Sequence, residues 1–426
     1  MASTQRSAPR HRSSPVPAKP SSGDCPSDRT MVPVDRALRL ILAEGTTRAL
    51  EYVALDRAGG RILGLPIVAQ RAAPARDASA MDGYAVRNGD LIADWNALTV
   101  IGESFAGHGY AGGPLPTGSA VRIFTGAPVP EGFDRVILQE DVRHMGSQVL
   151  VPHPRAEKRH IRRAGSDFAA GDLLVDAPAA LTPARLVAAA AADIAEVAVF
   201  ARPKVMVVAT GDELRAPGVD TLRPDMIPES VSLGVAELAR SFGGDVTTHP
   251  RLPDDLGQLQ GAAAGMLDKA DIVVIIGGAS VGDRDFSRAM FERAGLSLQF
   301  SKVLMRPGKP VWFGTARDTC ILGLPGNPTA AMITARLFLA PLVAAMAGRE
   351  AQTAIDWRTR PLAEGLEANG EFECFLGARL IAGAASASAN RDSSAQRALA
   401  AIEVLIRRPP HAPAAAAGDP VETLEF

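Results

Sequence analysis

The sequence predicts a multidomain α/β protein that combines a doubly wound α/β domain, an inserted β module and a C-terminal β domain. The chain has 426 residues, which exceeds one ordinary hydrophobic core and indicates about three or four domains. From Lys204 onward, strand-like and helix-like runs alternate, as they do in sheets covered by helices on both faces. Residues 76–160 instead hold short β-like runs separated by glycine. These observations define the predicted architecture.

The N-terminal part is predicted to be a tail followed by helices. Residues 1–31 are rich in Ser, Pro, Arg and Ala. Because they contain few apolar groups, burial cannot offset the loss of chain entropy on folding, and we expect a disordered tail. Apolar residues then recur at helical spacing, which predicts a helix over residues 33–58 that begins behind Pro33. An Ala-rich helix is predicted over residues 182–192.

These two helices are expected to pack together and to form an elongated helical and linker domain from residues 32–75 and 161–202. The β module of residues 76–160 is then an insertion in that domain. Its strand-like runs are residues 99–101, 120–124, 135–138 and 149–151.

The predicted α/β domain covers residues 203–348, and the C-terminal β domain covers residues 349–426. In the α/β domain we expect strands over 204–209, 245–248, 271–276, 298–304, 311–314 and 319–323, and helices over 232–242, 254–268, 285–294 and 328–346. In the last domain, β-like segments at 372–381 and 402–406 surround the polar stretch 386–396.

Composition excludes several classes of function. The formal net charge of −2 argues against nucleic acid as the main partner, which would need a basic face. The cysteines (Cys25, Cys320 and Cys374) form neither metal-ligand spacing nor a disulfide framework, which indicates a reducing cytoplasm. Residues 1–31 lack a signal-peptide core. The Ala- and Val-rich stretches are interrupted by charges, Gly or Pro, so no membrane span is expected.

Glycine- and proline-rich loops follow or flank several apolar runs. The run 273–276 opens into Gly277-Gly278-Ala279-Ser280-Val281-Gly282-Asp283-Arg284-Asp285, the run 311–313 follows Arg306-Pro307-Gly308-Lys309-Pro310, and the run 320–322 opens into Leu324-Pro325-Gly326-Asn327-Pro328. Glycine lets backbone N–H groups approach an anion, and proline makes a loop rigid. At the carboxyl ends of strands, such loops predict a ligand site.

The charged residues of these loops suit a phosphorylated ligand held with a divalent cation. Asp283 and Asp285 follow the glycine run, where carboxylates can bind the cation, although an N-cap role for Asp285 remains open. Arg306 and Lys309 flank a Pro-Gly turn and could neutralise phosphate or another oxyanion. Alone, each would more often be a solvated surface charge.

Three further segments carry candidate polar groups. Asp77 and Asp82 lie beside Ser79 and a Gly-Tyr turn, a pattern that is more often only an Asx-type turn leading into a strand. Thr125 ends an apolar run that could be only a strand end with a rigid turn, although its hydroxyl is well placed to hydrogen-bond a ligand. Glu213 follows a predicted buried strand, where a helix N-cap is as plausible as a metal or substrate role.

Other mechanisms lack their motifs. The sequence contains no Walker A loop and no GxGxxG placed after a strand, which argues against NTP hydrolysis and nicotinamide chemistry. It also contains no HExxH and no CxxC pair.

Taken in order, seven segments resemble the molybdopterin molybdenumtransferase family, which comprises bacterial MoeA and the gephyrin E domain. These segments are SAMDGYA (79–85), RIFTGAPVP (122–130), IRRAGSD (161–167), ATGDEL (209–214), GGASVGDRDF (277–286), RPGKP (306–310) and LPGNP (324–328). The match runs from about residue 33 to residue 348, and the ordered set is far more specific than any one motif. The family's elongated four-domain architecture agrees with the organisation predicted above.

The resemblance implies insertion of molybdate into adenylated molybdopterin with release of AMP, assisted by Mg²⁺. It implies a homodimer, transient contact with molybdopterin adenylyltransferase and molybdoenzymes, and a cytoplasmic location without nucleic-acid or membrane partners. The implied catalytic residues are Asp82, Thr125, Glu213, Asp285, Lys302, Arg306 and Lys309, of which Glu213, Asp285 and Asp82 would hold the metal. The implied ligand-binding residues are Gly277, Gly278, Ser280, Gly282, Pro307, Gly308, Pro325, Gly326, Asn327 and Pro328. Asp167 also falls on a functional position of the family.

The sequence departs from the family pattern at three places. Pro228-Glu229-Ser230-Val231 stands where a Tyr-Asp-Ser-Asn-like stretch is usual, which affects substrate affinity more than reaction type. Arg306 stands where lysine is common, so a planar fork replaces a point charge. Asn390-Arg391-Asp392-Ser393-Ser394 replaces a Gln-Gly-Ser-type loop, in which Ser393 or Ser394 is the expected substitute. A molybdopterin adenylyltransferase and a non-catalytic molybdopterin-binding scaffold remain as alternatives.

Overall fold

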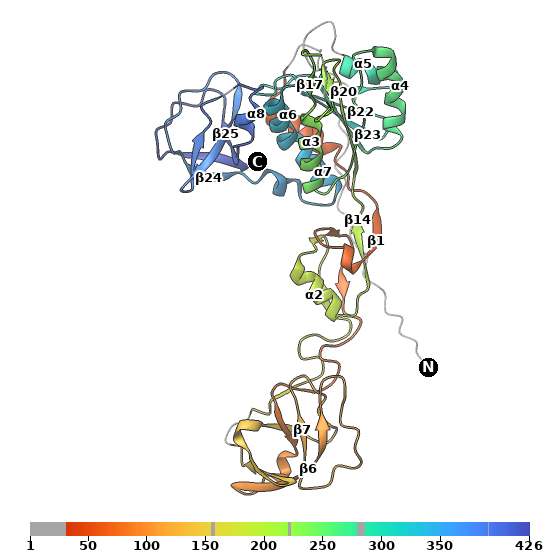
Figure 1. Cartoon of the computed structure of the whole chain (residues 1–426), viewed down its shortest axis with the longest axis vertical. Coiled ribbons are helices and arrows are strands. Elements are labelled where there is room, and N and C mark those ends of the chain that lie inside the picture. Colours follow the sequence, from red (N-terminus) through yellow and green to blue (C-terminus); the bar gives the residue numbers. More distant parts are fainter. Residues whose placement is uncertain (1–30, 155–157, 220–222, 279–285, 391) are drawn as a thin grey trace, which may run out of the picture. The chain divides into compact units, whose positions relative to one another are not determined.

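The computed structural model describes residues 31–154, 158–219, 223–278, 286–390 and 392–426. Within them the chain divides into two compact units (Figure 1). The first unit comprises the chain up to Gly45, Pro203–Val343 and Ala354–Phe426. The second unit comprises Thr46–Arg202 and Ala344–Thr353. The tail predicted over residues 1–31 lies almost wholly outside the described residues.

A six-stranded sheet forms the centre of the first unit. Its strand order is β18 (Asp245–Thr248), β15 (Lys204–Ala209), β19 (Ile272–Ile276), β23 (Thr319–Leu324), β22 (Trp312–Ala316) and β20 (Ser297–Phe300). The first four strands are mutually parallel, whereas β22 and β20 form an antiparallel edge. β19 and β23 are buried at every residue, as expected for central strands covered on both faces. The doubly wound α/β prediction is confirmed.

Helices cover both faces of this sheet (Figure 1). One face carries α4 (Leu256–Leu267) and α5 (Phe286–Glu292), whose side chains Leu259, Met266 and Phe291 form a common core with strand residues such as Ile275. The other face carries α3 (Val231–Ser241), α6 (Pro328–Thr334) and α7 (Ala340–Met346). Asp255 begins α4 because its side chain accepts a hydrogen bond from Gln258 N at 2.8 Å.

Residues 328–346 form a continuous helical segment with a π-helical turn at Ala335–Leu339. The segment is long and apolar enough to cross a membrane by length and composition, but 83% of it is buried inside the fold, as in a core helix. Its charged residue, Arg336, donates to Glu425 O at 2.7 Å and to Ala354 O at 2.5 Å. Burial lowers the pKa of Arg336 to about 10. This guanidinium therefore fastens the last strand of the chain to the core helix.

The C-terminal module is a sheet that also receives a strand from the α/β domain. Its order is β21 (Met305–Arg306), β25 (Glu373–Ile381), β27 (Val404–Arg408), β28 (Pro420–Glu425) and β24 (Arg358–Pro361), with β26 (Ala384–Ala387) paired to β25. The short helix α8 (Gln396–Leu399) lies between β26 and β27 in the chain. The β-like segments predicted at 372–381 and 402–406 are confirmed, and β21 shows how the 306–310 loop is anchored to this module.

The second unit contains the inserted β module and a smaller sheet. The module's strand order is β8 (Arg135–Leu138), β5 (Gly83–Val86), β7 (Ser119–Ile123), β6 (Trp95–Ser104), β10 (Gln148–Pro152) and β9 (Arg143–Met145). The four runs predicted there all lie within strands or extend one by a residue. The smaller sheet has the order β1 (Leu50–Ala54), β14 (Glu196–Phe200), β2 (Ile62–Leu63) and β13 (Ala179–Ala180), next to α2 (Pro183–Ala191).

The helix predicted over residues 33–58 is wrong beyond its first third. The helix α1 (Val34–Ala43) ends before Gly45, and residues 50–54 instead form β1, which pairs antiparallel with β14 from Leu50↔Phe200 to Ala54↔Glu196. The strand partner lies far along the chain, so local periodicity carried no sign of it. The linker region is therefore largely a small sheet with one helix, and α1 and α2 do not form one helical domain, since they belong to different units.

Candidate active site

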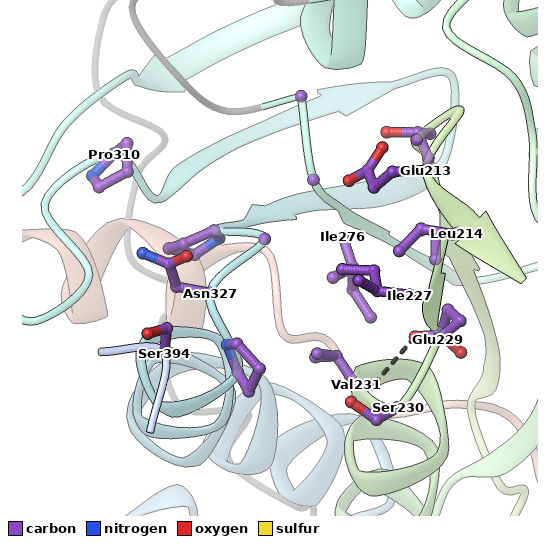
Figure 2. Close-up of a pocket in the computed structure, with 18 of the residues that line it drawn as sticks. Glu213, Leu214, Ile227, Glu229, Ser230, Val231, Ile276, Pro310, Asn327 and Ser394 are labelled. Atoms are coloured by element: carbon purple, nitrogen blue, oxygen red, sulfur yellow. Dashed lines mark hydrogen bonds between the residues drawn. The ribbon is translucent and has the colours of Figure 1, made fainter. Parts of the chain in front are cut away.

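A pocket of about 690 Å³ opens in the first unit, at the carboxyl ends of β15, β19 and β23 (Figure 2). It is bounded by five loops of the α/β domain (209–214, 227–231, 276–278, 302–310 and 325–328), by Asp254, and by Ser394 and Gln396 of the C-terminal module. The sequence-predicted site residues that line it are Glu213, Gly277, Gly278, Lys302, Lys309, Pro325, Gly326, Asn327 and Pro328. Residues far apart in the sequence thus meet at one edge of the sheet, as the strand order requires.

Backbone hydrogen bonds hold the three strand-end loops together. Thr210 N donates to Ile276 O at 2.9 Å, and Gly277 N donates to Leu324 O at 3.2 Å. Gly277 has φ +95°, and a Cβ there would lie 2.7 Å from Thr210 O. Glycine is therefore required where these loops approach one another. Gly278 follows with φ +61°, and consecutive glycines of this kind form a concave backbone surface suited to an anion.

A buried polar relay behind the pocket fixes Gly278. Trp312 Nε1 donates to Ser287 Oγ at 3.1 Å, and Ser287 Oγ donates to Gly278 O at 3.1 Å. Trp312 and Ser287 are each 1% exposed. The indole lies against β23, where a Cβ on Gly323 would be 1.9 Å from Trp312 Nε1. Sequence reasoning missed this relay, because nothing in the pattern links residues 278, 287 and 312.

The helix α6 begins at the pocket. Asn327 is its N-cap residue and Pro328 occupies its first turn, where the missing N–H of proline costs nothing. The Asn327 side chain turns outward and donates through Nδ2 to Ser393 Oγ at 2.9 Å. Thr329 N donates to Ser393 O at 3.0 Å. The C-terminal module therefore contacts the pocket at the start of α6, in the loop where a serine substitute was expected.

A second contact from that module reaches α3. Gln396 Nε2 donates to Ser230 Oγ at 3.3 Å, and both residues line the pocket together with Ser394. Figure 2 shows Ser394 beside Asn327 and Ser230 at the start of α3. The sequence contained no signal for Gln396, since α8 is only four residues long.

Three carboxylates line the pocket, and they differ in whether they already accept hydrogen bonds from the start of a helix. Glu229 Oε1 accepts from Val231 N and Ser232 N, each at 2.9 Å, so this side chain caps α3 (Figure 2). Glu213 lies against Gly211, where a Cβ would be 2.6 Å from Glu213 Oε2. Asp254 also lines the pocket, and its backbone N–H donates to Asp212 Oδ1 at 3.2 Å. Of the two glutamates, Glu213 is the one whose carboxylate is not used in a helix cap.

The carboxylates that line the pocket supply part of the ligand set expected for Mg²⁺. Among the described residues, no group of three or more His, Cys, Asp or Glu side chains could hold a metal. Mg²⁺, however, is commonly held by one or two carboxylates together with substrate phosphates, and Glu213 meets that requirement. The predicted site residues Asp285, Ser280 and Gly282 lie outside the described residues, so the full set of metal ligands stays a prediction.

In the Arg306–Pro310 loop, some residues line the pocket and the others hold the loop in place. Lys309 and Pro310 line the pocket with Lys302, whereas Arg306, Pro307 and Gly308 do not. Gly308 has φ +107°, and a Cβ there would be 2.3 Å from Thr334 Cγ2. Pro307 lines a separate cavity of about 50 Å³. The Pro-Gly turn therefore shapes the loop that presents Lys309.

In the second unit, Asp82 and Thr125 form a pair. Asp82 Oδ1 accepts from Thr125 N at 2.7 Å and from Thr125 Oγ1 at 2.8 Å. The backbone N–H of Thr125, and then its hydroxyl, lower the pKa of the Asp82 carboxyl below its usual range. Two motifs that sequence reasoning treated separately thus meet, with Asp82 held ionised at the surface. Asp167 is exposed elsewhere in this unit, and its N–H donates to Ala73 O at 3.0 Å.

Comparison with known proteins covers most of the chain. Residues 32–192 match the family model described as the MoeA N-terminal region (domain I and II), and residues 206–345 match the probable molybdopterin binding domain. The molybdopterin molybdenumtransferase of Haemophilus influenzae is 37% identical over 313 residues, which is 73% of this chain and 75% of that protein. The enzyme of the same name from Synechococcus elongatus is 34% identical over 81% of this chain and 87% of its own length.

The fold comparison agrees. A crystal structure of the molybdopterin biosynthesis MoeA protein from Pyrococcus horikoshii superposes with a TM-score of 0.80 at 27% identity, over 93% of this chain and 99% of that one. The superposed length is therefore large enough to include both matched family regions.

Proposed function

The chain belongs to the molybdopterin molybdenumtransferase family, and we propose that it inserts molybdate into adenylated molybdopterin at the pocket of the first unit, with release of AMP and with Mg²⁺ as cofactor. It is an enzyme of molybdenum cofactor biosynthesis. The observation that carries the location is the convergence of Gly277, Gly278, Lys302, Lys309 and Glu213 on one cavity.

The pocket supplies the binding groups that this reaction needs. Adenylated molybdopterin carries a pyrophosphate, which suits the concave backbone surface of the Gly277-Gly278 turn. Molybdate is a dianion that must approach this anionic ligand. Lys302 and Lys309 line the pocket and would offset the repulsion between the two. Positioning and electrostatics are thus the main contribution of the protein.

Release of AMP requires attack of a water oxygen on phosphorus and rupture of the bond to the AMP oxygen. AMP departs with the bonding electron pair, and the pocket cations stabilise that developing charge. Glu213 would hold Mg²⁺, with Asp285 as a further proposed ligand. When bound, Mg²⁺ would polarise the phosphoanhydride. The adenylyltransferase and scaffold alternatives are not favoured, because relatives of similar extent bear the molybdenumtransferase name.

The test is AMP release from purified full-length protein given adenylated molybdopterin and Mg²⁺, with and without molybdate. We expect release that depends on molybdate and accompanies formation of molybdenum cofactor, measured by chromatography of AMP and by reconstitution of a molybdoenzyme. Tight binding of the adenylated ligand without release in either condition would instead identify a carrier. Omission of Mg²⁺ with addition of a chelator should lower the rate, and an unchanged rate would contradict the proposed cofactor.

We also propose a homodimer, as the family resemblance implies. Support comes from β1, an edge strand of its sheet, which leaves Leu50 42% and Tyr52 69% exposed. Apolar side chains on an unpaired edge are typical of a surface that is covered in an assembly. Multi-angle light scattering at micromolar concentration should show twice the 44.5 kDa chain mass. A single species at the chain mass would contradict the dimer.

A cytoplasmic location is proposed as well, together with transient contact with molybdopterin adenylyltransferase and recipient molybdoenzymes. Its support is the cysteine pattern of the sequence, because Cys25, Cys320 and Cys374 form neither metal-ligand spacing nor a disulfide framework, as is typical of a reducing compartment. Cell fractionation followed by detection of the protein in the membrane or exported fraction would contradict it.

A further inference from the structure

Strand pairing places an aromatic ring of the C-terminal module beside the Arg306–Pro310 loop. β21 pairs in parallel with β25, in the register Met305↔Glu373 and Arg306↔Cys374. Glu373 N donates to Leu304 O at 3.1 Å, so the backbone on both sides of this contact is fixed. Phe372 immediately precedes β25 and is half-buried. Its position relative to Arg306 is therefore set by the sheet and not by loop packing alone.

Two cations lie over this one ring. The guanidinium carbon of Arg306 is 4.4 Å from the centroid of the Phe372 ring, and Lys309 Nζ is 5.7 Å from the same centroid. Both distances fall within the range of a cation–π interaction. The turn between the two residues is held by hydrogen bonds from Val303 N to Lys309 O and from Val311 N to Gly308 O, each at 3.0 Å.

Because the partner of Arg306 and Lys309 is an aromatic ring, their positive charges remain available to bind an anion. Among the residues that the structure describes, no carboxylate forms an ion pair with Arg306 or Lys309. A carboxylate would restrain these side chains and also neutralise them. An aromatic face restrains a cation through its quadrupole and adds no net charge. Both side chains are also exposed, so an incoming anion can reach them.

We propose that Phe372 is a positioning residue that holds Arg306 and Lys309 as one dicationic pair for a tetrahedral oxyanion, which is molybdate in the reaction proposed above. Lys309 lines the pocket. Arg306 does not line it, but it lies over the same Phe372 ring and supplies the second positive charge next to Lys309. The planar guanidinium of Arg306 can stack on the ring and still present N–H groups along its edge. This accounts for an arginine at a position where a lysine would satisfy charge alone.

The proposal rests on the proposed function for the identity of the oxyanion, and its test has a binding readout that does not. In the full-length protein, Phe372→Leu keeps an apolar side chain and removes the ring, whereas Phe372→Tyr and Phe372→Trp keep the ring. We expect Phe372→Leu to raise the KM for molybdate by about three- to tenfold with kcat within about twofold of wild type. The Tyr and Trp variants should restore wild-type KM.

Isothermal titration with molybdate, and with sulfate as a second tetrahedral dianion, should show the same ranking. The matched control is Trp95→Leu, which removes an aromatic ring 4.5 Å from the Arg143 guanidinium in the β module and should leave both affinities unchanged. Thermal unfolding of each variant identifies any loss of fold. An unchanged affinity in Phe372→Leu, or an equal loss in the Tyr variant, would overturn the positioning role.

The two proposals fail separately. If wild type releases no AMP but Phe372→Leu still weakens dianion binding, the proposed reaction fails at this site and the positioning role stands. If wild type is active and Phe372→Leu matches it in KM and in titration, the reaction stands and the positioning role fails.

Discussion

Replacement of Glu213 by Gln is expected to lower the rate of molybdate-dependent AMP release by about 10²- to 10³-fold, while binding of adenylated molybdopterin stays within about threefold of wild type. The reason is that Gln keeps the size of the side chain and removes the charge, and Glu213 is the pocket glutamate not used to cap a helix. Single-turnover kinetics and equilibrium titration of the ligand separate the two effects.

The matched control is Glu237→Gln. Glu237 lies on α3 with its side chain 75% exposed and pairs with Arg240 one turn away, so its loss should leave turnover unchanged. Raising the Mg²⁺ concentration should recover part of the activity of the Glu213 variant if its defect is weakened metal binding. Wild-type turnover in Glu213→Gln would remove this residue from the reaction and with it the support for a metal at this place.

The second large effect is expected at Gly277. In Gly277→Ala the new Cβ would lie 2.7 Å from Thr210 O, at a φ of +95°. The strand-end loops must then separate, and we expect a loss of about 1–3 kcal/mol in the free energy of unfolding together with a rise of at least about tenfold in the Kd for adenylated molybdopterin. Chemical denaturation and ligand titration measure the two quantities.

Gly261→Ala provides the control within the same unit. Gly261 lies in the middle of α4, with nothing within 4 Å of an added Cβ. Alanine in a helix interior is favoured over glycine, so this variant should gain about 0.5–1 kcal/mol and bind normally. If Gly277→Ala behaves like Gly261→Ala, the loops do not need the close approach seen in the structure.

The elements that the sequence predicted well are those whose cause is local. β15 and β18 coincide with the predicted ranges because their apolar and β-branched residues are bounded by Gly and Pro. The pocket loops followed from the same signals, since Gly277 and Pro325 directly follow central strands. Lys309 and Glu213 could be placed at the pocket because the strand order of a doubly wound sheet brings such loops together.

What the sequence could not supply is pairing between distant segments. β1 was read as helix because its partner β14 lies beyond the whole inserted module. Phe372 and Gln396 belong to the C-terminal module, whose sheet pairs with β21 of the α/β domain, and both contact residues at or beside the pocket. Ser287 and Trp312 act through two hydrogen bonds that no spacing rule contains. These are the residues on which the shape of the site depends most.

Arg336 has a consequence for how the α/β domain and the C-terminal sheet unfold. The guanidinium sits within the core helical segment, and one of its acceptors is Glu425 O of β28. If β28 leaves its sheet, a buried charge loses one of its partners. The C-terminal sheet and the interior of the α/β domain are therefore expected to unfold as one cooperative unit.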